Sequence, residues 1–451
     1  MGINKEILRL ALPSILANIT IPLVGMVDIA VAGHLDTSAA ALIGGISVGS
    51  LLFDLLYWNF GFLRAGTSGL TAQAYGRSDY RNSVQTLQRA LTVSIGIAAL
   101  LIAIQWIFIK GAFLIISCSE EVHDLASQYF FIRIWAAPAT LSIMAFKGWF
   151  IGMQDSFSSM LADLVINGVN IAASIILTLG AGNFNGIGFA GIAAGTVIAQ
   201  YSGLLLCISI ILLKYKKLFT STKYSFNAIM KSPDTRKFFS MNTDLFFRSI
   251  CFVLIYEGFT LIAARYGDTL LAVSSILMKI LMVFSFFTDG FAYAGEAMTG
   301  KYIGKNDWKM VHRTIVWTFV WSMGIALLFI FIYYTCGIPM VGLMTADAEV
   351  IEASRQFIPW LLAMPLLGCA AFTWDGIYIG ATDSKGTRDA MILAALAFFG
   401  IWFAGSIGSS QKSHEWHIHL LMGAYFAHLA ARTIYLTVKY INRNTFKTTT
   451  T

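Results

Sequence analysis

The chain contains few charged residues. Asp, Glu, Lys and Arg make up 12% of its 451 residues, whereas 57% are hydrophobic, and soluble globular domains use about 25% charged residues. This composition excludes an ordinary soluble protein. Apolar segments long enough to cross a hydrocarbon layer of about 30 Å recur from residue 7 to residue 440. We predict an all-α polytopic membrane protein with twelve transmembrane helices, because the strands of a membrane barrel would alternate in polarity over only about ten residues.

Cysteine is also scarce. The five cysteines are odd in number and form no C-x-x-C pair, which argues against both a disulfide framework and a cysteine metal site. The segment HEWHIH (414–419) departs from the HExxH zinc motif at Ile418 and is predicted to be a surface loop. The sequence contains no recognisable pattern of nucleophile and base. We therefore expect no enzymatic activity, no cofactor and no bound metal.

Basic residues exceed acidic ones, and they follow a pattern. The formal net charge of +7 could indicate nucleic-acid binding. However, the basic residues concentrate in every second break between the helices, and the breaks GHLDTS, SEEV, GAGNFNG and MTADAEV are neutral or acidic. By the positive-inside rule, the basic breaks and both termini face the cytoplasm. We therefore expect no nucleic-acid partner.

The chain repeats itself once. GFLRAGTSGLTAQAYGRSDY (61–80) matches GFAYAGEAMTGKYIGKNDW (290–308) at an offset of 229 that becomes 228, and GWFIGMQDS (148–156) matches GIYIGATDS (376–384) at 228. Two distant matches at nearly one offset indicate an internal duplication. We predict four parts: an N-lobe of six helices (1–213), a basic cytoplasmic linker (214–237), a C-lobe of six helices (238–441) and a cytoplasmic tail (442–451).

The even number of helices in each half gives both halves the same orientation. They are parallel repeats, related by an axis along the membrane normal. Folds of this kind place a cavity between the halves, and alternating access follows when one half rocks against the other.

One carboxylate interrupts the first apolar segment. Asp28 lies within IPLVGMVDIAVAG (21–33), where a charge near the membrane centre costs about 2.5 to 3.5 kcal/mol. Such a residue is a candidate functional site. The repeat offset of 229 places Glu257 of helix seven at the position that corresponds to Asp28. Two carboxylates at equivalent depth predict a central cavity that protons can reach.

The sequence resembles the multidrug and toxic compound extrusion (MATE) transporters, specifically their DinF branch. The resemblance covers nearly the whole chain and is carried by LPSILANITIPLVGMVDIAVAGHLD, FLRAGTSGLTAQAYG, DGFAYAGEA and DGIYIGAT. It implies a MATE-like fold, with Asp28, fifteen residues after Pro13, as the protonation site. It also implies an aspartate in helix five, four residues after an asparagine. Asn170 is present, but Ser174 occupies the aspartate position, which leaves more of the coupling to Asp28 and Glu257.

Other charged residues within the helices are candidates for the transport site. Asp289 of helix eight could face the cavity. Asp54 and Arg64 of helix two, ten residues apart, could contribute to a polar network.

Two further pairs have structural alternatives. Asp375 and Lys147 occupy equivalent positions in the repeats, and they could form an ion pair between the lobes or extend to the cytoplasmic interface. Asp244 and Arg248, four residues apart in helix seven, are predicted to form a salt bridge within that helix.

These observations predict a cation-coupled exporter of the bacterial inner membrane. We expect protons to drive export of amphipathic, cationic compounds by a monomer, with Asp28 as the protonation switch. Sodium is the alternative coupling ion. Organic anions or lipid-linked compounds are alternative substrates, because Arg64, Lys147 and Lys279 would suit a negative charge.

Overall fold

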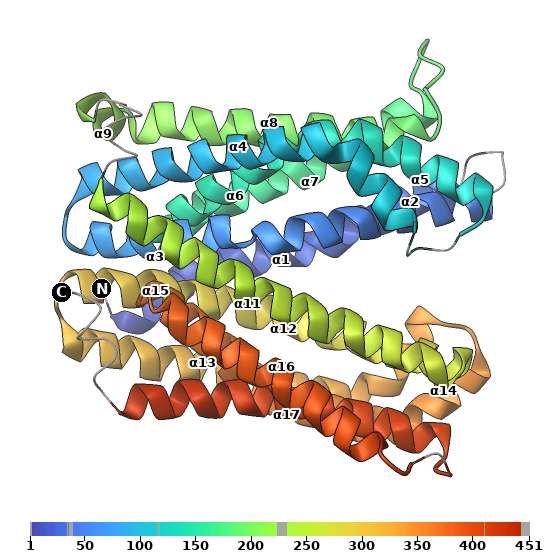
Figure 1. Ribbon diagram of the computed structural model, residues 1–451. Coiled ribbons are helices and arrows are strands. Elements are labelled where there is room, and N and C mark those ends of the chain that lie inside the picture. Colours follow the sequence, from blue (N-terminus) through green and yellow to red (C-terminus); the bar gives the residue numbers. More distant parts are fainter. Residues whose placement is uncertain are drawn as a thin grey trace. The chain divides into compact units, whose positions relative to one another are not determined.

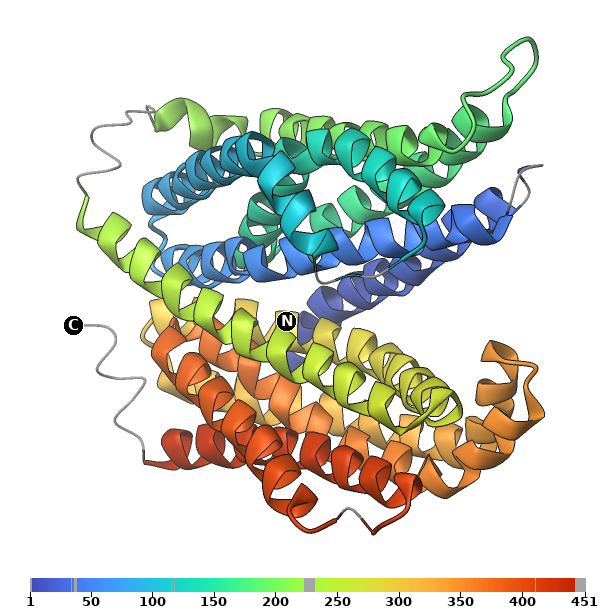
Figure 2. The same cartoon turned by 45° about the vertical axis from the view of Figure 1, so that its right-hand side comes forward.

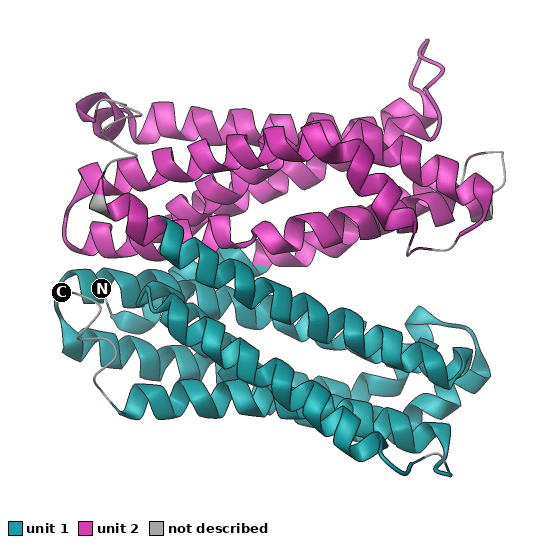
Figure 3. Ribbon diagram, viewed as in Figure 1, with its two compact units in different colours: residues 1–15, 239–451 teal, residues 16–238 magenta. Residues whose placement is uncertain are grey.

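The computed structural model describes residues 2–33, 35, 39–114, 116, 118–222, 232–409 and 411–442, except for the side chains of residues 39, 40 and 233. It divides into two compact units (Figure 3): an N-terminal unit, Leu16–Phe238, and a C-terminal unit, Met1–Ile15 with Phe239–Thr451. Residues 223–231 of the expected linker and 443–451 of the expected tail lie outside the described residues. The described residues are helical, apart from turns and one isolated β-bridge between Ala181 and Phe184.

The N-terminal unit consists of helices that follow one another along the chain (Figure 1). Its elements are α1 (Ile3–Gly33, from Leu16 onward), α2 (Ala39–Tyr57), η1 (Trp58–Phe60), α3 (Phe62–Gly76), α4 (Tyr80–Phe113), α5 (Glu120–Arg133), η2 (Ile134–Ala136), α6 (Ala137–Gly152), α7 (Ser156–Leu179), α8 (Ala190–Lys214) and α9 (Lys216–Ser221).

The C-terminal unit repeats this plan. Its elements are the first part of α1, then α11 (Pro233–Ala263, from Phe239 onward), η3 (Ala264–Tyr266), α12 (Asp268–Gly304), α13 (Trp308–Met344), α14 (Ala348–Ser354), η4 (Arg355–Phe357), α15 (Ile358–Gly380), α16 (Ser384–Ser406) and α17 (His414–Ile441). Within it, α16 and α17 lie side by side (Figures 1 and 2).

The described residues contain eleven helices that are long and apolar enough to span a membrane. The 28-residue α17 is a twelfth helix of spanning length, but its histidines and Arg432 lower its hydropathy. Three of the twelve helical segments contain a short 3₁₀ segment in their interior: η1, η2 and η4. The expected twelve-helix, two-repeat membrane fold is thus confirmed.

Four equivalent turns show the duplication at atomic level. Each turn runs from the last glycine of a helix, through a residue with positive φ, to an aspartate that caps the next helix. The positive-φ residues are Ser78, Gln154, Asn306 and Thr382, and the capping aspartates are Asp79, Asp155, Asp307 and Asp383. Each aspartate accepts a hydrogen bond from the backbone N–H three residues later. That N–H lies in the first turn of the helix, where it has no acceptor within the helix itself.

Equivalent glycines bring equivalent helices together. A Cβ atom added to Gly148 of α6 would collide with the carbonyl oxygen of Arg64 in α3, and one added to Gly376 of α15 would collide with that of Ala292 in α12. Each glycine begins a G-x-x-x-G pattern, which lets helices in membranes approach closely. The matched sequences GWFIG and GIYIG are therefore helix-packing motifs.

The first turns of α1 pack within the C-terminal unit. Lys301 of α12 donates to Glu6 at 2.9 Å, and Trp321 of α13 donates to Asn4 at 3.3 Å. A Cβ atom on Gly290 would also collide with Ile15. Helix α1 therefore belongs to both units, divided between Ile15 and Leu16.

Candidate functional site

Asp28 lies in the part of α1 that belongs to the N-terminal unit. Its side chain is 5% exposed, and the Ser174 hydroxyl of α7 faces it. Within the described residues, however, neither Asp28 Oδ1 nor the Ser174 oxygen has a hydrogen-bond partner. The serine at the position of the expected helix-five aspartate therefore lies beside Asp28.

Neighbouring oxygen atoms extend this polar region along α7. Asn170, Ser174 and Thr178 follow at intervals of four residues and are all buried, so they lie on one face of the helix. Asn170 donates to Thr196 of α8 at 3.0 Å, which leaves Asn170 Oδ1 without a partner in the described part of the chain. Gly195 allows α8 to reach this face, because a Cβ there would collide with Ser174.

Glycines also determine how α2 and α5 meet. A Cβ atom on Gly45 would collide with Leu125 of α5, and one on Gly49 would collide with Tyr129. These glycines are four residues apart in α2, so their shared face accepts α5 at close range. The contact places Tyr129, and one turn later Arg133, next to the last turns of α2.

Arg133 brings a positive charge to this region. Its Nη1 donates to the Tyr129 hydroxyl at 2.9 Å, and its guanidinium lies 4.6 Å from the ring centroid of Phe53, a cation–π distance. Its charge acts on both Asp28 and Asp54. Arg133 is half-buried and Asp54 is exposed. The guanidinium thus packs on Phe53, the residue that precedes Asp54 in α2.

Sequence reasoning missed Arg133. The residue interrupts the apolar run FFIRIWAAP (130–138), just as Asp28 interrupts its own segment. A search for charged residues within apolar segments, which identified Asp28, would therefore also have identified Arg133. It immediately precedes η2, and Asp54 lies four residues before η1. Short 3₁₀ stretches within helices often mark hinges at functional positions.

The C-terminal unit contains a separate charge cluster. Asp375 accepts hydrogen bonds from Arg248 of α11 and Arg432 of α17, and Arg432 is 2% exposed. Asp244, for its part, pairs with Arg388 of α16 at 2.6 Å. The prediction of a salt bridge between Asp244 and Arg248 within α11 is therefore wrong, because each residue pairs with a residue on another helix.

Lys147 likewise has a local partner. Its Nζ lies 2.8 Å from Asp163 of α7 in the same unit. With Asp375 held by Arg248 and Arg432, both residues of the suggested inter-lobe pair have partners inside their own units.

The other candidates lie on helices other than α1, α2 and α7. Glu257 of α11 and Asp289 of α12 are half-buried members of the C-terminal unit. Arg64 is half-buried in α3, where its carbonyl oxygen faces Gly148. Asp28, Asn170 and Ser174 thus lie in one region of the N-terminal unit, and Asp54 is exposed on α2 of the same unit.

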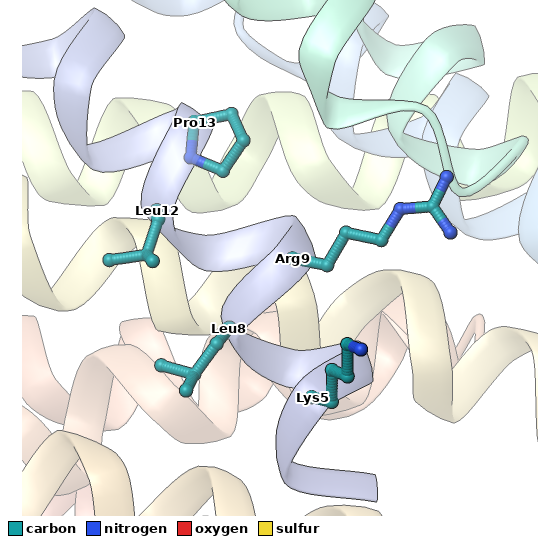
Figure 4. Close-up of a pocket in the computed structure, with 5 residues that line it drawn as sticks. All are labelled: Lys5, Leu8, Arg9, Leu12 and Pro13. Carbon is teal, nitrogen blue, oxygen red and sulfur yellow. The ribbon is translucent and has the colours of Figure 1, made fainter. Parts of the chain in front are cut away.

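A largely apolar pocket lies elsewhere on α1. It has a volume of about 560 Å³ and is lined by Lys5, Leu8, Arg9, Leu12 and Pro13. Figure 4 shows the two basic side chains on one side of the helix and the two leucines on the other. Pro13 and Asp28 are fifteen residues apart, about 22 Å along a helix, so the pocket is separate from Asp28.

The described residues contain no group of three or more His, Cys, Asp or Glu side chains that could hold a metal ion. The segment HEWHIH begins α17 and is not the expected surface loop. His417 is 7% exposed there and bonds to Ser409 at 2.9 Å, because the helix turns its ring inward.

Comparisons with known proteins identify the family. The family model MatE matches residues 13–176 and again residues 245–410. Similar curated proteins include DNA damage-inducible protein F of Escherichia coli (strain K12), which is 32% identical over 94% of each chain. Another is a probable multidrug resistance protein NorM of Photorhabdus laumondii, 25% identical over 89% of this chain and 86% of that protein.

Solved structures show the same fold. An outward-facing multidrug resistance MATE family transporter of the MOP superfamily superposes with a TM-score of 0.85, at 16% identity, over 99% of this chain and 97% of that one. The fold and sequence together define a polytopic membrane transporter. This chain belongs to the MatE family of multidrug and toxic compound extrusion transporters. It is a multi-pass membrane transporter for small molecules and not an enzyme.

Proposed function

We propose that this chain is a proton-coupled antiporter that exports amphipathic cations, with Asp28 as the group that binds proton and substrate in turn. One observation carries the proposal: Asp28 is a buried carboxylate in a membrane-spanning helix, with an oxygen that lacks a hydrogen-bond partner in the described residues. A carboxylate held in that way is stable only when a cation or a proton neutralises it.

The transport cycle follows from this exchange. Substrate binds from the cytoplasm while Asp28 is ionised, the protein opens outward, and protonation of Asp28 weakens substrate binding and releases it. A membrane potential near 100 mV contributes about 2.3 kcal/mol for each charge moved inward. We place the protein in a bacterial inner membrane as a monomer without a cofactor, with both termini in the cytoplasm.

Sodium is a second candidate for the coupling ion. The observation that favours it is the set of buried oxygens around Asp28, namely Asn170 Oδ1, the Ser174 hydroxyl and the Thr178 hydroxyl, none of which has a partner within the described residues. Hard cations bind to several oxygen ligands of this kind. Proton coupling remains our proposal, because a proton needs only the carboxylate.

The first experiment uses everted vesicles, in which export from the cytoplasmic face carries a fluorescent cationic dye into the lumen, and measures this efflux activity with an imposed proton or sodium gradient. We expect the proton gradient to drive efflux by the wild type, and Asp28→Asn to reduce its rate by at least about a hundredfold. Asp124→Asn is the control, since Asp124 is exposed and pairs only with His123 in the described residues. Proton-driven efflux by the Asp28 variant at the wild-type rate would refute the proposal.

A further inference from the structure

The C-terminal unit contains a buried charge cluster in which positive charge exceeds negative charge. The Arg248 guanidinium of α11 and the Arg432 guanidinium of α17 both donate to the same atom, Asp375 Oδ2 of α15. Arg432 Nε also donates to Asp375 Oδ1 at 3.2 Å. Two guanidiniums thus share a single carboxylate, and one positive charge is left in excess.

No second carboxylate pairs with either arginine in the described part of the chain. The salt bridges of Arg248 and Arg432 there all lead to Asp375. Glu257 is on the same helix as Arg248 but follows it by nine residues. That interval is about two and a half turns, so the two side chains point to opposite sides of α11.

The charged groups one turn away from the arginines do not change this balance. Asp244 lies one turn before Arg248, but it pairs with Arg388 of α16 at 2.6 Å. His428 lies one turn before Arg432, and a histidine supplies no negative charge. Neither residue therefore removes the excess positive charge.

Both arginines also retain hydrogen-bond donors that no acceptor uses. Arg432 Nη1 and Arg248 Nε are buried and have no partner within the described residues. Arg432 is 2% exposed, and the ring centroid of Phe372 lies 5.4 Å from its guanidinium carbon. Its Nη2 reaches the Ala371 carbonyl oxygen at 3.4 Å. The side chain of Arg248 is 22% exposed, so the cluster is accessible from the side of Arg248.

An excess charge of this kind calls for an anion. Both arginines lie in helices of membrane-spanning length, where an uncompensated charge is costly. Guanidinium N–H groups bind carboxylates strongly, as the contacts with Asp375 already show, and a halide accepts the same donors.

We propose that Arg248 and Arg432 form a binding site for a small monovalent anion, either chloride or the carboxylate group of an organic acid. Asp375 holds the two guanidiniums together, and the anion takes the donors that Asp375 leaves unused. The site belongs to the C-terminal unit, whereas Asp28 belongs to the N-terminal unit. The inference therefore goes beyond the proposed exchange at Asp28 and does not depend on it.

Thermal unfolding of the purified full-length protein in detergent tests the site. Sodium chloride or sodium acetate replaces sodium isethionate, a salt of a larger anion, at constant sodium concentration and ionic strength. Because a bound anion stabilises the folded state, the unfolding temperature of the wild type should rise with chloride or acetate and reach a plateau. A stronger response to chloride identifies a halide site, and a stronger response to acetate identifies a carboxylate site.

Two variants change the charge of the cluster in opposite directions. Arg432→Gln removes the excess charge and leaves Arg248 paired with Asp375, so the anion affinity should fall at least about tenfold. Asp375→Asn releases both guanidiniums, so the affinity should rise at least about tenfold. A purely structural role of the cluster predicts no such gain. Arg248→Gln makes the same change of charge as Arg432→Gln at a half-buried position, in case the latter variant does not fold.

The matched control is Arg355→Gln in the same unit, because Arg355 is exposed and pairs with Glu352. It should respond to anions as the wild type does. A wild type that responds to neither anion would overturn the inference, as would a response that is the same in Arg432→Gln, Asp375→Asn and the wild type. Asp28→Asn should keep the anion response, so failure of this inference and failure of the proposed coupling role are separate results.

Discussion

At the scale of single residues, Asp155 shows how one side chain joins the start of α7 to the end of α8. It caps α7 through the backbone N–H of Ser158 and accepts hydrogen bonds from Lys214 Nζ at 2.6 Å and the Tyr215 hydroxyl at 2.8 Å. Burial by itself would raise the pKa of Asp155, but the hydrogen bonds from Lys214, Ser158 and Tyr215 outweigh it and lower the pKa below its ordinary value. The carboxylate is therefore part of the folded structure in its charged form.

Replacing Asp155 by Asn should lower the free energy of unfolding by about 1 to 2 kcal/mol at pH 7, because it removes a charge-assisted contact. The pKa of Asp155 is lower in the folded protein than in the unfolded chain, where it is near 3.9. Its contribution to the free energy of unfolding is therefore fully present above the unfolded pKa and is lost as the pH falls through the folded pKa. Thermal unfolding in detergent at several pH values measures it. The difference between wild type and variant should be constant from pH 7 to about pH 5 and shrink below about pH 4.

Asp79→Asn is the matched control, because Asp79 occupies the equivalent turn but is exposed, and it caps α4 without a lysine partner in the described residues. Its effect should stay within about 0.5 kcal/mol. A stability difference for Asp155→Asn that does not change below pH 4 would contradict the assignment.

Single residues also show what the sequence could and could not reveal. Asp28 could be identified because a charge in an apolar run is unusual in itself. The partners of Asp244 and Arg248 could not, because spacing along one helix says nothing about Arg388 or Asp375 on other helices. Arg133 was detectable as a charge within a span, but its contact with Phe53 depends on how α2 and α5 pack.

At the scale of elements, the repeated glycines determine which helices touch. The sequence matches around Gly148 and Gly376 predicted a duplication, and the structure gives the physical reason: each glycine faces a backbone carbonyl of an earlier helix, α3 for Gly148 and α12 for Gly376. The 3₁₀ segments η1, η2 and η4 were not predicted, because no proline or glycine occupies their three positions.

Gly376→Ala should therefore lower the free energy of unfolding by about 1 to 3 kcal/mol, because the added methyl group forces α15 and α12 apart. Gly324→Ala in α13 is the control, since a Cβ there would meet no atom within 4 Å, and alanine favours the helix by up to about 1 kcal/mol. Thermal unfolding of both variants in detergent gives the comparison. Equal stability of the two would show that the close contact between α12 and α15 is not required.

At the scale of the whole molecule, orientation in the membrane decides the direction of coupling. Asp28 lies five residues before the end of α1 at Gly33, about 8 Å along the helix axis. If the N-terminus is cytoplasmic, as the distribution of basic residues predicts, this end faces outward. Protons from outside then reach Asp28 over a short path, as inward proton movement requires.

Labelling with a membrane-impermeant maleimide in intact cells tests this orientation. The native Cys118 is exposed and lies between α4 and α5, in a break predicted to be external, so it should react in intact cells, and Cys118→Ser should abolish that reaction. In the serine background, Lys305→Cys, at an exposed position in the turn between α12 and α13, should react only after permeabilisation. The reverse pattern would place Asp28 near the cytoplasm, where an inward proton gradient would protonate it last, and the proposed direction of exchange would be wrong.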